Sequence, residues 1–452
     1  MACLGAGAAS VLLPGASGRF AVPPTSSDEV RVLAKRLCST PRAGLLGLVE
    51  ETIKAGGAPR TLLAATLLAG LHDLRPSPVG NDLHVNMMVA SAMELGDRSS
   101  KVDSWLLAIW NADYYKRVKH DQWGLAQRPE VKKSSAAAAR KEFHAAMNAW
   151  DALRVDRAVI ELWRHHRDAG AMFEEIWPYG ARCFHAIGHK PVYTSQIARA
   201  LPAFNRRQQE AALRSLARGL VSGRMVKVYR RSRELVARLP DGWLRGKEQP
   251  SRSGEILLGL RSCDSKQAQD LVITAFREGI GPQTVWDGLR LYASELFHQR
   301  AHDQAPDRGA VVLPVHAVTE IEALGYAWRA ATHDATKRLL VLQAAGWLPD
   351  HRVLFARRTG HDTSRPGLDV VARERGQIQI AAELARLTRS VAHRAAEAHQ
   401  IKYAAALANE VRYVHPRWRP WLVAPAAIYL MAGAESESTR KAMAVLKRAG
   451  VS

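Results

Sequence analysis

Two histidines that lie four residues apart, His185 and His189, could perform chemistry together. That spacing places both side chains on one face of a helix, where two imidazoles can bind one metal ion. The chain has 17 histidines, so such a pair also arises by chance. The alternative is a half-buried pair that is satisfied by hydrogen bonds.

The stretch that carries His189 has a counterpart later in the chain. Residues 188–201 align with residues 398–411, and the alignment matches His189 with His399 at the start of an Ala-rich segment. A second pair lies upstream, where His84 and His316 each precede an apolar segment that ends in Leu-Gly. The histidines of the two halves are 105 (189 − 84) and 83 (399 − 316) residues apart.

This order predicts two tandem-duplicated helical halves with a metal site at their pseudo-twofold interface. The histidines that the duplication pairs are the predicted ligands: His84, His189, His316 and His399. His185 is the reserve ligand, or a residue that orients a ligand.

The composition predicts an all-α fold, a large helical array. Ala, Leu and Arg dominate the sequence, and strict two-residue alternation of apolar residues is hard to find. With 452 residues, of which 47% are hydrophobic, the chain can bury one large core or two closely packed ones.

The formal net charge of +21 raises the possibility of nucleic-acid binding. The basic residues are scattered along many segments, few aromatic residues lie between them, and no nucleic-acid-binding motif is present. We therefore expect a basic solvated surface and no nucleic-acid partner. The four cysteines form no CxxC pair, which argues against a structural zinc site.

Residues 1–26 are predicted to be a signal-like or disordered segment. They are small and apolar and resemble the core and cleavage site of an export signal without its basic start. The chain is expected to be periplasmic or exported if this segment is a truncated signal peptide, and cytoplasmic if Met1 is the true start. No later apolar run reaches the roughly 18 uncharged residues of a transmembrane helix.

The rest of the chain is predicted to form one compact unit from two halves. Helical half 1 covers 27–240, a polar linker with Gly, Pro and Ser covers 241–254, and helical half 2 covers 255–452. Asn81 and Asp82 are expected to cap the helix that carries His84.

Four ordered motifs resemble those of one known family. They are His84 with the segment that ends in Leu95-Gly96, Phe184-His-Ala-Ile-Gly-His189, His316-Ala-Val-Thr319, and His399-Gln-Ile-Lys402. In this order they are similar to the motifs of the questin oxidase-like proteins, which are non-heme iron enzymes that oxidise or cleave aromatic polyketides. The resemblance spans residues 80–405. It departs from the family at Met87 and Met88, where a second histidine is expected, and at Lys190-Pro191 after His189.

The resemblance implies an iron centre with four histidines and a carboxylated lysine, and it assigns the lysine to Lys402. It also implies a function: a non-heme Fe(II) oxygenase that uses dioxygen on an aromatic or polyketide-like substrate. An anionic oxygen ligand would balance a divalent ion among neutral imidazoles. The alternative for Lys402 is an ordinary lysine that extends its amine to solvent. Candidate walls of the substrate pocket are Tyr193, Trp328 and Tyr403.

Two other functions remain open at this point. The same histidines would suit zinc, in a hydrolase or in a metal-binding protein without redox chemistry. Alternatively, the chain is a non-catalytic basic helical scaffold in which the histidines are incidental.

Overall fold

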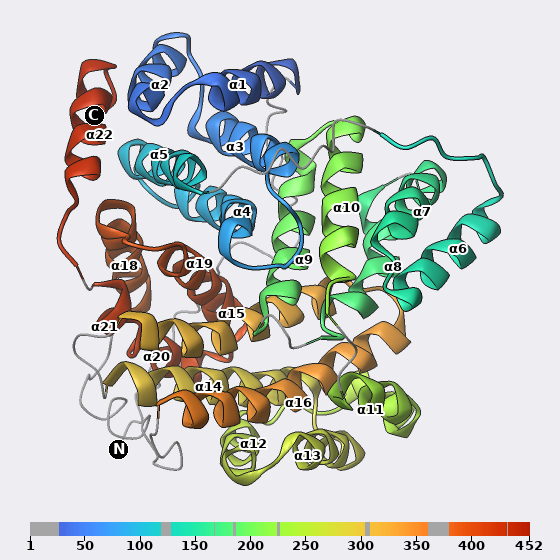
Figure 1. Ribbon diagram of the computed structural model, residues 1–452. Coiled ribbons are helices and arrows are strands. Elements are labelled where there is room, and N and C mark those ends of the chain that lie inside the picture. The colour runs from blue at the N-terminus through green and yellow to red at the C-terminus, as the bar shows by residue number, and fades with distance from the viewer. Residues whose placement is uncertain are drawn as a thin grey trace, which may run out of the picture.

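Helices make up most of the part of the chain that the structure describes. The computed structural model describes residues 27–118, 128–166, 168–183, 187–223, 227–302, 308–359, 379–431 and 433–452. Within these ranges there is no β-strand, and the one extended pairing is an isolated bridge between Lys247 and Ile280. The all-α prediction is therefore confirmed (Figure 1).

The helices have the following bounds in chain order. The α-helices are α1 (Ser27–Ser39), α2 (Leu45–Lys54), α3 (Pro59–Asp73), α4 (His84–Gly96), α5 (Lys101–Arg117), α6 (Ala136–Ala149), α7 (Ala152–His165), α8 (Ala169–Gly180), α9 (His189–Ala200), α10 (Arg206–Leu220), α11 (Lys227–Leu235), α12 (Pro250–Ser262), α13 (Ser265–Arg277), α14 (Pro282–His302), α15 (Arg308–Ala330), α16 (Asp334–Thr359), α18 (Ile380–Arg394), α19 (Ala398–Tyr413), α20 (Arg419–Val423), α21 (Ala426–Leu430) and α22 (Glu437–Arg448). Short 3-10 turns are η1 (Arg42–Gly44), η2 (Asn81–Leu83), η3 (Leu201–Ala203), η4 (Val236–Arg238), η5 (Trp243–Arg245) and η6 (Pro416–Trp418).

Four helices, α4, α9, α15 and α19, form a closed ring at the centre of the molecule (Figure 1). Helix α4 packs against α9 and α19, and α15 packs against the same two helices on the other side. The predicted half 1 contributes α4 and α9, and the predicted half 2 contributes α15 and α19. This pairing agrees with the expected duplication, which stays a hypothesis.

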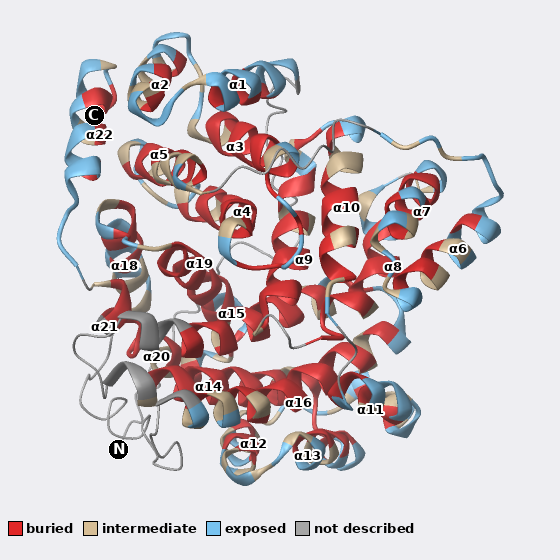
Figure 2. Cartoon of the chain, in the orientation of Figure 1, coloured by how far each residue is buried: buried red, intermediate tan, exposed pale blue. Residues whose placement is uncertain are grey.

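The ring helices are buried on nearly all sides (Figure 2). In α19 every residue from Ala398 to Val411 is buried, and α4 is buried over most of its length. A helix that is apolar all round has no solvent face and belongs inside a large protein. The Ala-rich sequence of α19 further lets neighbouring backbones approach closely, because alanine adds little side-chain volume.

A polar cluster joins the four ring helices near their C-terminal ends. Arg199 of α9 forms ion pairs with Glu322 of α15 and with Glu94 of α4. Asn409 of α19 donates to Glu94 at 2.7 Å and to Glu322 at 3.4 Å. Buried charges are tolerated only when they are paired, so this cluster also fixes which helices are neighbours.

The remaining helices cover the ring. Helices α3 and α5 pack against α4, and α1 packs on α3. Helix α10 lies between α7 and α9, while α14 and α16 both pack against α15 and carry α12 and α13 on their outer sides. In the described part of the chain, no helix combines the length and the apolar character that a bilayer crossing needs.

The structure corrects two local predictions. Residues 241–254 are packed against the second half: Trp243 is buried and donates to Asp334 at 2.7 Å, and helix α12 already begins at Pro250. The expected cap of the His84 helix is wrong, because residues 81–83 form the 3-10 turn η2 and no side chain caps α4. Residues 1–26 lie outside the described residues, and the division into halves stays a prediction.

Candidate metal centre

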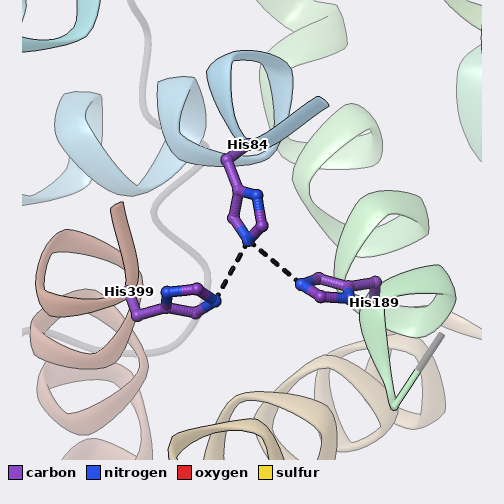
Figure 3. A group of neighbouring side chains, drawn as sticks. All are labelled: His84, His189 and His399. Atoms are coloured by element: carbon purple, nitrogen blue, oxygen red, sulfur yellow. Dashed lines mark hydrogen bonds between the residues drawn. The ribbon is translucent and has the colours of Figure 1, made fainter. Parts of the chain in front are cut away.

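The four paired histidines meet at one end of the helical ring. His84 and His189 are the first residues of α4 and α9, His399 is the second residue of α19, and His316 lies within α15. The Nε2 atom of His84 lies 3.0 Å from that of His189 and 3.0 Å from that of His399 (Figure 3). The Nε2 atom of His316 lies 2.9 Å from that of His189.

The ring plane of His189 is nearly perpendicular to those of His84 and His316. The centroids of His189 and His316 are 4.3 Å apart with planes at 86°, and those of His84 and His189 are 4.8 Å apart, also at 86°. The rings therefore do not stack, and their Nε2 atoms converge. His316 and His399 close the group with a centroid distance of 4.8 Å.

The spacing of the nitrogens matches that of ligands around one metal ion. Two imidazole nitrogens at about 2.1 Å from a metal are about 3.0 Å apart when the ligand angle is 90°, and about 3.4 Å apart when it is tetrahedral. The three Nε2 distances of 2.9–3.0 Å therefore correspond to adjacent positions of an octahedral or related geometry.

Hydrogen bonds at the opposite ring nitrogens fix two of the tautomers. The Nδ1 of His84 donates to the carbonyl oxygen of Asn81 at 2.6 Å, and the Nδ1 of His399 donates to Glu397 Oε2 at 3.0 Å. A carbonyl and an ionised carboxylate only accept, so in both neutral rings the proton is on Nδ1. Two unprotonated Nε2 atoms then face each other at 3.0 Å, an arrangement that repels unless a cation lies between them.

Burial keeps His84, His316 and His399 neutral. All four histidine residues are at most 9% exposed. Desolvation, reinforced by Lys402 and neighbouring histidines, holds the pKa of His84 and of His316 well below the ordinary value. Desolvation and Lys402 likewise lower the pKa of His399 to about 4, although Glu397 opposes them. Neutral imidazoles with free Nε2 lone pairs are what metal binding requires.

Two glycines allow His189 to reach the group. Gly188 directly precedes α9 and has a φ of 86°, and a Cβ atom there would lie 2.7 Å from Glu320 Oε2. Gly80 has φ of 142°, and a Cβ atom there would lie 3.5 Å from Nδ1 of His189. Both backbone conformations disfavour residues with a side chain. The turns before α4 and α9 are thus built on glycine where chain segments approach closely.

Lys402 lies one helical turn after His399 and is buried with it. Desolvation lowers its pKa to about 7, against a small opposing effect of Glu397. Its charge acts on His84, His316 and His399, which places it beside the histidine group. A lysine whose pKa is lowered in this way loses its proton more easily than an exposed lysine, and the neutral amine is able to react or to bind.

The three predicted pocket residues contact residues outside this group. His185 lies outside the described residues. Tyr193 is buried and shares a hydrogen bond of 2.8 Å with Ser215, and Tyr403 is buried against Phe297 at a centroid distance of 4.6 Å. Trp328 packs against Trp243 and Trp286. Their role as walls of a substrate pocket stays a prediction.

Two sizeable cavities lie away from the histidines. One of about 810 Å³ lies between α1, α3 and α10, and one of about 530 Å³ lies at the C-terminal ends of the ring helices. None of the four histidines lines either of them. The candidate metal centre is therefore identified by the convergence of nitrogen donor atoms and not by the size of a cavity.

Sequence reasoning missed the two groups that orient the histidines. The carbonyl of Asn81 is a backbone atom and has no sequence pattern. Glu397 precedes His399 by two residues at the start of α19, and its side chain also accepts from Tyr429. The sequence pattern that could have revealed the role of Glu397 is a carboxylate close to a candidate ligand at the start of a helix.

Comparison with protein-family models, with curated proteins and with solved structures gives no match for this chain. The resemblance to the questin oxidase-like proteins therefore rests on the four motifs alone. The structure brings the histidines of those motifs together, and a group of His84, His189 and His399 has the mutual distances of a metal site.

Proposed function

We propose that His84, His189, His316 and His399 bind one divalent metal ion and that the chain is a metal-dependent enzyme. The observation that carries the proposal is the pair of fixed tautomers, which turns the Nε2 lone pairs of His84 and His399 toward each other at 3.0 Å. A buried cation between the two nitrogen atoms removes the repulsion and is coordinated by their lone pairs.

Iron is the metal that we propose, in a non-heme oxygenase acting on an aromatic or polyketide-like substrate. The near-90° spacing of the nitrogens supports an octahedral ion such as Fe(II) more than tetrahedral zinc. Four histidines leave coordination positions for other ligands. When bound, Fe(II) supplies the ability to activate dioxygen for reaction with an electron-rich organic molecule.

The helix ends around the site favour an anionic partner. His84, His189 and His399 lie in the first turns of α4, α9 and α19, so three helix N-termini converge on the group. The partial positive charges of the three helix N-termini add to the charge of a metal ion, and neutral imidazoles do not offset this positive charge. An ionised substrate hydroxyl would offset it, and so would a carbamate on the amine of Lys402, formed by addition of carbon dioxide to the neutral amine.

The histidines and the two groups that orient them have different roles in this proposal. The four histidines bind the ion and exclude bulk water, since all of them are buried. The carbonyl of Asn81 and the carboxylate of Glu397 hold protons on the Nδ1 atoms of His84 and His399. Hydrogen bonds of this kind orient the ring and make Nε2 a stronger donor.

A zinc-dependent hydrolase is the second candidate. It is favoured by the all-nitrogen donor set of the described group, because imidazole is a common zinc ligand and an iron site often includes a carboxylate. The identity of the bound metal, iron or zinc, distinguishes the oxygenase proposal from the hydrolase proposal.

The test is elemental analysis of protein purified without added metal, followed by EPR of the anaerobic protein with nitric oxide. We expect about one iron per chain and a nitrosyl signal from an accessible coordination position. His316→Ala and His399→Ala should each lose the metal, whereas His333→Ala, which removes a largely exposed histidine, should retain it. Stoichiometric zinc would favour the hydrolase. Full metal occupancy in both ligand variants would refute the assignment.

A further inference from the structure

The cavity of about 530 Å³ lies at the opposite end of the helical ring from the histidines. Its walls come from the C-terminal parts of all four ring helices, including Glu94 of α4, Arg199 of α9, Arg329 of α15 and Asn409 of α19. Ten residues separate His84 from Glu94, which corresponds to about 15 Å along a helix. The cavity is thus a separate site from the metal centre.

Arginines dominate the charge of this cavity. Arg60, Arg98, Arg199, Arg329 and Arg412 line it, against two acidic residues. The lining therefore carries a formal charge of +3 (five minus two). Four helix C-termini surround the cavity and stabilise cations there, which helps to hold the arginines in place.

Two of these arginines have buried nitrogen atoms that lack a hydrogen-bond partner. Among the described residues, neither Nη1 of Arg199 nor Nη1 and Nη2 of Arg329 have an acceptor. The Arg199 side chain is 6% exposed, so water does not readily replace its missing acceptor, whereas the Arg329 side chain is 21% exposed. A buried guanidinium donor without an acceptor is destabilising and needs an explanation.

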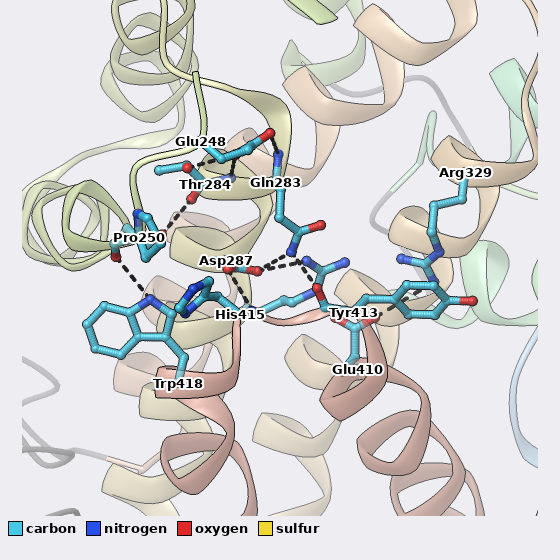
Figure 4. A network of polar contacts seen from close by, with 12 residues as sticks. Glu248, Pro250, Gln283, Thr284, Asp287, Arg329, Glu410, Tyr413, His415 and Trp418 are labelled. Atoms are coloured by element: carbon cyan, nitrogen blue, oxygen red, sulfur yellow. Dashed lines mark hydrogen bonds and ion pairs between the residues drawn. The ribbon is translucent and has the colours of Figure 1, made fainter. Parts of the chain in front are cut away.

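One oxygen of the natural acceptor for Arg329, Oε2 of Glu410, is already occupied, whereas Oε1 has no hydrogen-bond partner. Glu410 forms an ion pair with Arg290, which also binds Asp287 at 3.1 Å (Figure 4). The other oxygen of Glu410, Oε1, lies 3.9 Å from Nη2 of Arg329, a distance too long for a hydrogen bond. Arg329 is therefore held near a carboxylate without being satisfied by it.

Tyrosine rings hold both guanidinium groups in a fixed plane. The guanidinium of Arg199 lies over Tyr326 at 4.2 Å, and that of Arg329 lies over Tyr413 at 3.6 Å. Stacking uses the flat face of the guanidinium, whereas its N–H groups lie in the plane and stay free to donate. Both tyrosines also line the cavity. The cavity therefore has arginine N–H donors in fixed positions next to two tyrosine rings.

We propose that this cavity binds a small organic oxyanion, such as a carboxylate or a phosphate. Arg329 and Arg199 would donate to its oxygens, and Tyr326 and Tyr413 would contact its carbon framework. The guanidinium fork matches the geometry of both oxyanions. The volume of about 530 Å³ lies within the usual range for small-molecule sites.

The test is calorimetric titration of the full chain with citrate and with inorganic phosphate at constant ionic strength. We expect saturable 1:1 binding of at least one of them, weakened at least about tenfold by Arg329→Gln, because charge-assisted hydrogen bonds are lost. Arg412→Gln removes an exposed arginine at the rim of the cavity and should weaken binding less. Arg207→Gln removes the same charge from the other large cavity and should leave the affinity unchanged.

Circular dichroism confirms that each variant is folded. Absence of saturable binding for both anions overturns the proposal, and so does equal weakening by Arg329→Gln and Arg207→Gln, which would indicate unspecific attraction to a basic surface. Metal content is measured on the same samples. Because the cavity shares no residue with the histidine group, the metal proposal and this one fail or succeed separately.

Discussion

Glu397 is the residue whose substitution tests the orientation of the metal ligands most sharply. Its carboxylate accepts from His399 Nδ1 at 3.0 Å and also from the hydroxyl of Tyr429. Burial alone would raise the pKa of Glu397, but His399 and Tyr429 outweigh it and the pKa is lowered, so the group is an ionised acceptor at pH 7. We choose Glu397→Gln because it keeps the size and removes the charge.

The expected loss follows from the geometry. A glutamine has one carbonyl oxygen for two donors, and its NH₂ group can turn toward Nδ1 of His399. The histidine proton then moves to Nε2, the atom that faces His84 at 3.0 Å, and blocks a ligand position. Loss of such an orienting partner weakens metal binding by about 10- to 100-fold, or about 1.4–2.7 kcal/mol.

The assay is competition for the metal with a chelator, combined with ¹⁵N NMR of the histidine rings to identify the tautomer. Glu234→Gln is the matched control, since it removes the same charge from an exposed position on α11. Unchanged affinity together with an unchanged His399 tautomer in Glu397→Gln would refute the orienting role. A change in folding stability alone would not alter the tautomer.

Three further predictions concern pH, Lys402 and a turn glycine. His399 has a pKa of about 4 in the folded chain and about 6.5 when unfolded, so the unfolded state binds more protons as pH falls. The free energy of unfolding of the metal-free protein should therefore fall as the pH is lowered from 6.5 to 4, with a contribution from His399 of roughly 3 kcal/mol at most. Urea unfolding at a series of pH values measures this change. An unfolding free energy that does not vary over this pH range would contradict the burial of His399 as a neutral ring. With ¹³C-bicarbonate, NMR should show a carbamate signal that Lys402→Met removes and Lys337→Met retains; a signal that persists without Lys402 excludes that lysine. Gly188→Ala should destabilise the fold by about 1–3 kcal/mol because of its positive φ, whereas Gly47→Ala, with open space around it in α2, should stabilise by up to about 1 kcal/mol. Equal unfolding midpoints for the two glycine variants would show that the turn before α9 is not strained.

The sequence predicted the elements that carry the site better than it predicted their surroundings. The apolar segment after His84 and the Ala-rich segment after His399 indicated helices, and α4 and α19 are helical. The duplication paired His84 with His316 and His189 with His399, and these four residues lie close together in the structure. The helices could be predicted because helical periodicity and residue type are local properties of the chain, whereas the metal-binding role of the four histidines stays a prediction.

The remaining features depend on contacts between distant segments. No local pattern indicates that the carbonyl of Asn81 would orient His84, or that residues 241–254 would pack against helices of the second half. The ion pairs that Arg199 forms with Glu94 and Glu322 join three helices separated by about a hundred residues each. Arginines are numerous in this chain, so composition alone could not single out these contacts.

The central claim is that four histidines bind one metal ion through Nε2, and X-ray absorption spectroscopy at the edge of the bound metal tests it most directly. The account predicts one shell of nitrogen or oxygen neighbours at about 2.1 Å with the outer-shell scattering of about four imidazole rings. His316→Ala should remove part or all of that scattering. A first shell of sulfur, or a metal site without imidazole scattering, would contradict the account.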